Sequence, residues 1–192
     1  MFNDLSSPLS LLETRRSGRP RDMVAPGPSP GELARILRIA ARTPDHGKLH
    51  PWRFVHVAQE RRGAFAELLR SAYSAANPAP GRLELEANER FARQAPELVV
   101  ALSTPTVPHK IPLWEQQLSC GAACMNLLSG AHALGYAAGW VTGWAAYSPI
   151  VREAFGATGE HDRLAGFIFL GTPGAEQEER LRPAYEDVTS EW

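Results

Sequence analysis

The sequence has few residues suited to covalent cross-links or metal sites. Only two cysteines occur, Cys120 and Cys124, four positions apart on one predicted helix. Disulfide frameworks and zinc sites need more cysteines, or cysteine and histidine at characteristic spacings. His46 and His50 are also four apart, but the prolines around them keep them from sharing a helical face. We therefore expect buried free thiols and no metal site.

The sequence also has few lysines and almost no net charge. Twenty basic residues face twenty-one acidic ones, which leaves a formal net charge of -1. Of the basic residues only Lys48 and Lys110 are lysine, so a single arginine carries little information here. No basic block alternates with aromatic residues, and we expect no nucleic-acid partner.

Long apolar runs and the common nucleotide motifs are missing too. No stretch of about 18 apolar residues occurs, and residues 1–10 lack a basic start followed by an apolar segment. We expect a cytoplasmic protein with no membrane partner. The sequence lacks Gly-x-Ser-x-Gly, the P-loop motif and a Gly-x-Gly-x-x-Gly that follows a strand. It therefore gives no support for a serine hydrolase, a P-loop protein or a dinucleotide-binding Rossmann domain.

The 192 residues, 44% of them hydrophobic, are enough for one compact domain with its own core, and we expect a single domain over residues 1–192. Capping and periodicity predict helices at 8–15, 33–42, 59–76, 82–94, 114–135 and 149–156. Apolar runs predict strands at 54–57, 98–103, 137–144 and 164–173. We interpret 21–28 as a connecting loop and 174–192 as a polar tail.

The predicted helix at 114–135 is the longest, and two of its faces are apolar. One stripe is formed by Leu118, Ala122, Met125 and Ala133, and the other by Cys124, Leu127, Leu128, Ala131 and Leu134. Two such stripes favour burial on more than one side. We expect one side to face the chain's own core and the other a partner.

Polar residues gather where two helices end. Arg15, Arg16, Ser17 and Arg19 follow the first helix with Gly18 among them, and guanidinium and hydroxyl groups are what a phosphate needs. The second helix ends in the loop 43–54, which carries two histidines and an aspartate between prolines. Each segment also has a simpler interpretation. The arginines after the first helix would suit a solvated basic helix end, and the polar residues of the loop 43–54 would suit an ordinary turn that caps the preceding helix.

The order of these segments resembles that of the nitroreductase family of FMN-dependent oxidoreductases. The shared features are an Arg-Arg-Ser helix end, Thr43-Pro44-Asp45-His46 before Pro51-Trp52-Arg53-Phe54, Trp114-Glu115-Gln116 opening the long helix, a Gly-Trp-x-x-Gly strand end and the final strand ending in Gly171-Thr172-Pro173. The resemblance covers nearly the whole chain and is closest to the compact branch of the family.

This resemblance implies an α+β fold: a three-layer α/β/α sandwich with a mixed, mainly antiparallel central sheet and a long central helix at a dimer interface. It also implies a homodimer that holds FMN at that interface, with NAD(P)H as co-substrate. NAD(P)H would reduce the flavin, and a nitroaromatic, a quinone or a similar small acceptor would reoxidise it in a ping-pong cycle.

The same resemblance assigns roles to residues. Arg15, Arg16 and Ser17 would hold the phosphate and ribityl chain, with Arg180 or Arg182 completing the site. Arg42 and His46 would contact the cofactor from the second loop, and Trp140, Val141, Thr142 and Gly143 would lie along the isoalloxazine. Arg19 and Arg42 are the candidates for the cation near the pyrimidine end. No side chain is needed as a general acid, because the flavin carries the hydride.

The chain departs from many relatives in the second loop, where His46 replaces an asparagine and His50-Pro51-Trp52 replaces Gln-Pro-Trp. A flavin-storing or sensor protein on the same fold is the alternative function, since fold alone does not fix function. Dehalogenation or flavin fragmentation is a third option, but those relatives usually carry extra lid sequence.

Overall fold

The computed structural model describes residues 2–192 and contains eight α-helices and five β-strands in these residues. The helices are α1 (Pro8–Thr14), α2 (Pro30–Ala40), α3 (Arg62–Ala76), α4 (Arg82–Arg93), α5 (Leu113–Ala133), α6 (Trp144–Tyr147), α7 (Pro149–Ala154) and α8 (Tyr185–Val188). The strands are β1 (Met23–Val24), β2 (Trp52–His56), β3 (Glu97–Ser103), β4 (Ala137–Val141) and β5 (Arg163–Pro173).

One antiparallel sheet forms the centre of the molecule. β3 lies between β2 and β5, and β4 and the short β1 also pair with β5. All of these pairings are antiparallel. The prediction of a mainly antiparallel sheet is therefore confirmed, although no parallel pair makes it mixed within residues 2–192.

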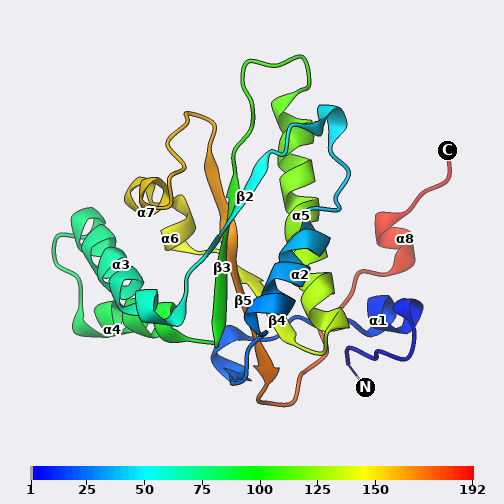
Figure 1. Ribbon diagram of the computed structural model, residues 1–192, viewed down its shortest axis with the longest axis horizontal. Helices are drawn as coiled ribbons and strands as arrows, with labels where there is room; N and C mark the ends of the chain where they lie inside the picture. Colours follow the sequence, from blue (N-terminus) through cyan, green and yellow to red (C-terminus); the bar gives the residue numbers. More distant parts are fainter. Residues whose placement is uncertain (1) are drawn as a thin grey trace.

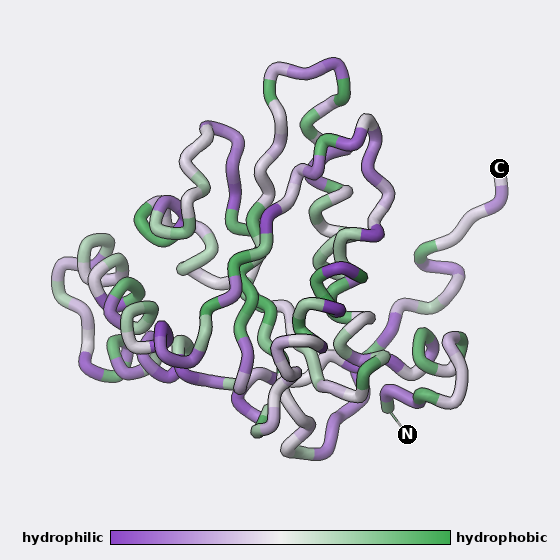
Figure 2. The backbone as a smooth tube through the Cα atoms, in the orientation of Figure 1, coloured by the Kyte–Doolittle hydropathy of each residue, from purple (hydrophilic) through white to green (hydrophobic). Residues whose placement is uncertain are grey.

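Helices cover both faces of the sheet, as Figure 1 shows. Leu98, Val100 and Leu102 of β3 point into the core under α3, α4, α6 and α7, whereas Val99 and Ala101 point into the core under α2 and α5. This alternation follows from the two-residue period of a strand, and it explains why β3 is apolar at consecutive positions. The central strands accordingly stand out as hydrophobic in Figure 2. The three-layer α/β/α sandwich is confirmed.

Local signals account for the helix starts. Ser29 accepts a hydrogen bond from the backbone N–H of Glu32, and the Glu32 carboxylate accepts one from the N–H of Ser29. This reciprocal pair satisfies two N–H groups that a helix start leaves free. The side chains of Ser7 and Ser148 cap α1 and α7 by accepting one backbone N–H each, and a proline follows in the first turn of both helices.

The long helix α5 buries only one of its two apolar stripes. Cys124, Leu127 and Ala131 are fully enclosed against the sheet and α2. The other stripe points outward: Leu118 is 53% exposed, Ala122 and Ala133 are exposed, and Met125 is half-buried. Trp114, one turn before Leu118, is 66% exposed and extends this stripe. A row of exposed apolar side chains along one helix is a surface that commonly meets another protein.

Three short elements were not predicted from the sequence. The loop at 21–28 contains β1, in which Met23 pairs with Pro173 and Val24 with Thr172. The four-residue α6 follows Gly143, and the four-residue α8 lies in the tail. Two or four residues are too few to show a period of 2 or 3.6. Within residues 2–192, no helix has the length and apolar character that crossing a bilayer would need.

One buried cation joins the helical pair α3–α4 to the sheet. Arg62 is 1% exposed and donates hydrogen bonds to the carbonyl oxygens of Val57, Ala92 and Gln94. Burial lowers the pKa of Arg62 to about 10, so the group stays charged at neutral pH. Its planar fork of donors fixes the end of α4 against the chain that leaves β2.

We predict that Arg62→Ala lowers the free energy of unfolding by about 3 kcal/mol, because several buried carbonyl groups lose their donor. Urea unfolding followed by circular dichroism measures the change. Arg61→Ala is the matched control, because Arg61 is exposed and should change stability by less than about 0.5 kcal/mol. Equal losses in both variants would contradict the structural role of Arg62.

Candidate functional site

The arginine-rich segment after α1 is attached to the edge strand β4. Arg16 is held by its backbone N–H, which donates to Asn3 Oδ1 at 2.9 Å, and the N–H of Gly18 donates to the carbonyl of Ala138 at 2.9 Å. Arg15 Nη1 donates to Ser17 Oγ at 3.3 Å. The predicted phosphate-binding residues are therefore fixed beside the start of β4.

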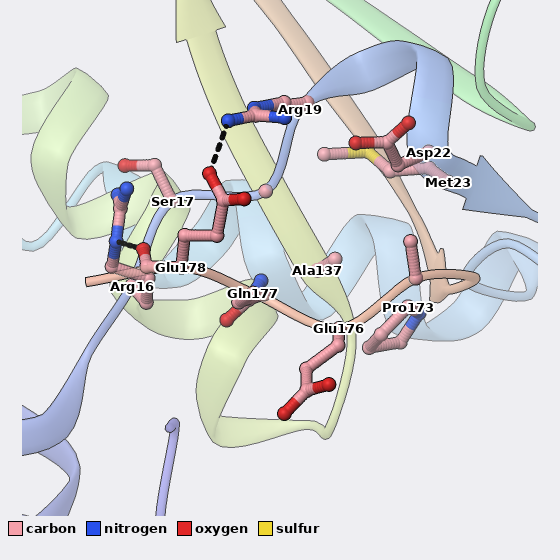
Figure 3. A pocket seen from close by; sticks show the side chains of 12 residues that line it. Arg16, Ser17, Arg19, Asp22, Met23, Ala137, Pro173, Glu176, Gln177 and Glu178 are labelled. Carbon is pink, nitrogen blue, oxygen red and sulfur yellow. Dashed lines mark hydrogen bonds and ion pairs between the residues drawn. The ribbon is translucent and has the colours of Figure 1, made fainter. Parts of the chain in front are cut away.

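The tail after β5 returns to this segment and adds charges of both signs. Arg16 and Arg19 line a cavity of about 40 Å³ together with Ser17, Gln177 and Glu178 (Figure 3). Arg180 and Arg182 lie near Arg16. We name Arg15, Arg16, Arg19, Arg180 and Arg182 the arginine cluster.

Crowding is visible in the acid–base properties of the arginine cluster. Burial lowers the pKa of Arg15, and the guanidinium groups of Arg182 and Arg16 lower it further. The pKa of Arg16 is also lowered, by burial and then by Arg180, while Glu179 acts in the opposite direction. Guanidinium groups that repel one another favour the binding of an anion, because the anion relieves the repulsion.

The far end of β4 forms a glycine turn. Trp140 is partly exposed, and its Nε1 donates to the carbonyl of Ala165 at 3.0 Å. Val141 ends the strand, and Thr142 and Gly143 are exposed. Gly143 has φ 94°, and a Cβ on it would meet no other atom within 4 Å. This backbone is open to a planar molecule, and the positive φ explains why glycine stands there.

Asn88 of α4 lies beside this turn and was missed in the sequence. A cavity of about 250 Å³ is lined by Asn88, Phe91, Thr142 and Gly143, among others. Asn88 Oδ1 accepts from Trp144 Nε1 at 3.0 Å, which fixes the orientation of the amide because an indole nitrogen can only donate. Asn88 Nδ2 is buried and has no partner within the described chain. A free donor of this kind suits an acceptor atom of a ligand.

His46 lies apart from the arginine cluster. His46 Nδ1 is 2.7 Å from Glu115 Oε2 near the start of α5, whereas Arg15 lies near His132 at its end. At 1.5 Å per residue these two positions on α5 are about 25 Å apart. The backbone carbonyl of Arg42 accepts from Asn126 Nδ2 at 3.4 Å, and its side chain is exposed. One chain therefore does not bring His46 to the arginine cluster.

The comparison with known sequences identifies the family. The sequence pattern of the nitroreductase family matches residues 12–172, which run from the end of α1 through α5 and nearly to the end of β5. The chain belongs to the nitroreductase family. The prediction made from the five sequence features is thus confirmed.

Individual members of the nitroreductase family support this assignment. The chain is 36% identical over 165 residues to the Escherichia coli (strain K12) protein named "Putative NAD(P)H nitroreductase YdjA", covering 86% of this chain and 87% of that protein. A nitroreductase-like family protein from Bacillus cereus has the same fold, with a TM-score of 0.78, 19% identity and coverage of 96% and 95%. A Bacteroides fragilis nitroreductase solved with bound FMN has a TM-score of 0.70, 22% identity and coverage of 95% and 98%.

Two features that could bind a ligand lie at opposite ends of β4 in this nitroreductase family member. The arginine cluster at its start can hold an anionic group, and the glycine turn and Asn88 at its end can contact a planar, hydrogen-bonding group. The four residue steps from Ala138 to Thr142, which directly follows β4, span about 13 Å. No group of three or more metal-binding side chains comes together within residues 2–192.

We predict that Gly139→Ala lowers the free energy of unfolding by about 1 to 3 kcal/mol, because a Cβ there would overlap the carbonyl oxygen of Gly18. The segment 15–19 should separate from β4, and trypsin should cleave it faster. Thermal unfolding and timed proteolysis measure the two effects.

Gly31→Ala is the control, because a Cβ at this helical position has open space around it. It should leave stability unchanged or raise it slightly. Unaltered stability and cleavage in Gly139→Ala would show that this close approach does not hold the arginine-rich segment.

Proposed function

We propose that the protein is an FMN-dependent oxidoreductase that passes hydride from NAD(P)H to a nitroaromatic, a quinone or a similar small acceptor. We further propose that residues 1–192 form one FMN-binding domain. The main support for this proposal is that the arginine cluster and the open glycine turn lie at opposite ends of β4. FMN has a phosphate at one end and a planar ring at the other, and YdjA is named for NAD(P)H.

The phosphate end of FMN fits the arginine cluster. Arg15, Arg16 and Ser17 offer two guanidinium groups and a hydroxyl at the end of α1, and Arg182 lies close enough to lower the pKa of Arg15. Guanidinium groups form paired, charge-assisted hydrogen bonds with phosphate oxygens. The five guanidinium groups of the cluster carry more positive charge than the carboxylates of Glu178 and Glu179 beside them neutralise. A phosphate dianion would balance the remaining positive charge.

The ring end of FMN fits the glycine turn. Thr142 and Gly143 expose backbone along which the isoalloxazine would lie, with a backbone N–H directed to N5 and Trp140 and Val141 beside it. The unpaired N–H of Asn88 adds a donor at the same turn.

The residues of the chain have a positioning and electrostatic role in this proposal. FMN, when bound, supplies the hydride transfer between the nicotinamide and the acceptor. The arginine cluster holds the anionic end, and the glycine turn keeps one face of the ring accessible. Because the turn is exposed, donor and acceptor can use the same face one after the other, which corresponds to a ping-pong cycle, and solvent can supply protons.

The distance between His46 and the arginine cluster supports a two-fold homodimer. If two copies pack their exposed α5 stripes together around a two-fold axis perpendicular to the helix, the two helices run antiparallel. The start of α5 in one copy then meets the end of α5 in the other. This arrangement brings the loop with Arg42 and His46 of one copy toward the arginine cluster of its neighbour and covers Trp114 and Leu118.

The first prediction from this proposal is that the purified protein carries non-covalent FMN, which NADH or NADPH bleaches without oxygen and a quinone restores. Mass analysis of the heat-released cofactor and anaerobic absorbance spectra measure both. Arg15→Ala should retain FMN about 10- to 100-fold less tightly, because one charge-assisted contact is lost.

Arg35→Ala is the control for this measurement, since Arg35 is exposed on α2. Release of FAD, or no flavin even after reconstitution, would overturn the cofactor assignment. Bound FMN that neither nicotinamide reduces would favour the flavin-storing or sensor protein instead.

The second prediction concerns the dimer. Leu118→Glu should produce a monomer that retains little FMN, because a carboxylate in the centre of an apolar interface is costly to desolvate. Light scattering and flavin absorbance measure the two effects. Leu83→Glu replaces a leucine on α4 that is even more exposed than Leu118, and it should leave a dimer. A parent protein that is monomeric with FMN bound at micromolar concentration would refute the interface.

A further inference from the structure

Two carboxylates of the chain's own tail occupy the arginine cluster. Glu178 Oε2 accepts from Arg19 Nη2 at 2.8 Å, and the backbone carbonyl of Glu178 accepts from Arg16 Nε at 2.6 Å. Glu179 Oε1 lies 3.9 Å from Arg16 Nε and 3.4 Å from Arg182 Nη2. Figure 3 shows the Glu178 side chain lying between Arg16 and Arg19. The tail thus supplies anionic oxygens where the cluster is most crowded.

The placement is specific to these two acidic residues. Glu176 belongs to the same segment, but its carboxylate points away from the arginines in Figure 3. The segment is attached near the cluster by Gln177, whose Oε1 accepts from Asn3 Nδ2 at 3.1 Å. Asn3 in turn accepts from the backbone of Arg16. Gln177 can therefore keep Glu178 and Glu179 close to the cluster.

We propose that Glu178 and Glu179 form an acidic latch, an internal anion that competes with the phosphate of FMN for the arginine cluster. The proposal rests on the proposed cofactor. In the latched state the carboxylates relieve the repulsion among the guanidinium groups. When the phosphate binds, it takes over this role and the two carboxylates move aside, which leaves Arg16, Arg19 and Arg182 free to contact it.

The exposure of the contacts suits a latch that opens readily. The side chains of Arg19 and Glu178 are 58% and 77% exposed, and exposed ion pairs contribute little stability. A phosphate dianion that meets several guanidinium groups at once forms stronger contacts than either carboxylate. The latch therefore weakens FMN binding moderately rather than preventing it.

The test compares the double variant Glu178→Gln/Glu179→Gln with the parent, using the full-length chain loaded with FMN or with riboflavin, which lacks the phosphate. Serial dilution and the fluorescence of released flavin give each dissociation constant. We expect the double variant to hold FMN about three- to tenfold more tightly, because two weak competing ion pairs are removed. Riboflavin affinity should not change.

Glu176→Gln is the matched control, because it removes one negative charge from the same segment without touching the arginines. It should leave both affinities within about twofold of the parent. If the double variant holds FMN no more tightly than the parent, or if riboflavin is tightened equally, the latch is refuted while FMN binding stands. If the parent binds no FMN under any condition, the proposed function and the latch both fail.

Discussion

Electrostatic repulsion within the arginine cluster is the constraint on which the site depends. Two segments far apart in the chain, the end of α1 and the tail after β5, bring like charges into one corner of the molecule. Without compensating anions this arrangement would be unfavourable, and the chain compensates with the carboxylates of Glu178 and Glu179 and with a hydrogen bond from Arg16 to the backbone carbonyl of Glu178. A site arranged in this way has a built-in preference for an anionic ligand.

The edge strand β4 sets the distance between the arginine-rich segment and the glycine turn. Its pairing with β5 fixes it to the sheet, and its contact with Gly18 fixes the arginine-rich segment at one end. The glycine turn at the other end is then held at a set distance. Gly139 permits the close approach of the two backbones, and Gly143 permits the turn. Two glycines four residues apart in sequence thus have different structural roles.

Much of this structure could be predicted from the sequence because the signals are local. The capped start of α2, the alternating burial of β3 and the two stripes of α5 each depend on neighbouring residues. Elements of two to four residues, such as β1 and α6, carry no such pattern. Asn88 and Arg62 stand in charged, alanine-rich helices, yet both are buried. Their burial depends on how α3 and α4 pack, which spacing in the sequence does not reveal.

The separation between His46 and Arg15 along α5 has a consequence for how the protein would respond to dilution. If each binding site is divided between two copies, a site exists only while the copies are associated. Cofactor occupancy would then depend on the concentration of the protein as well as on that of the cofactor, because binding and assembly stabilise each other. Flavin added to a dilute solution would draw the copies together, and loss of flavin would loosen the pair.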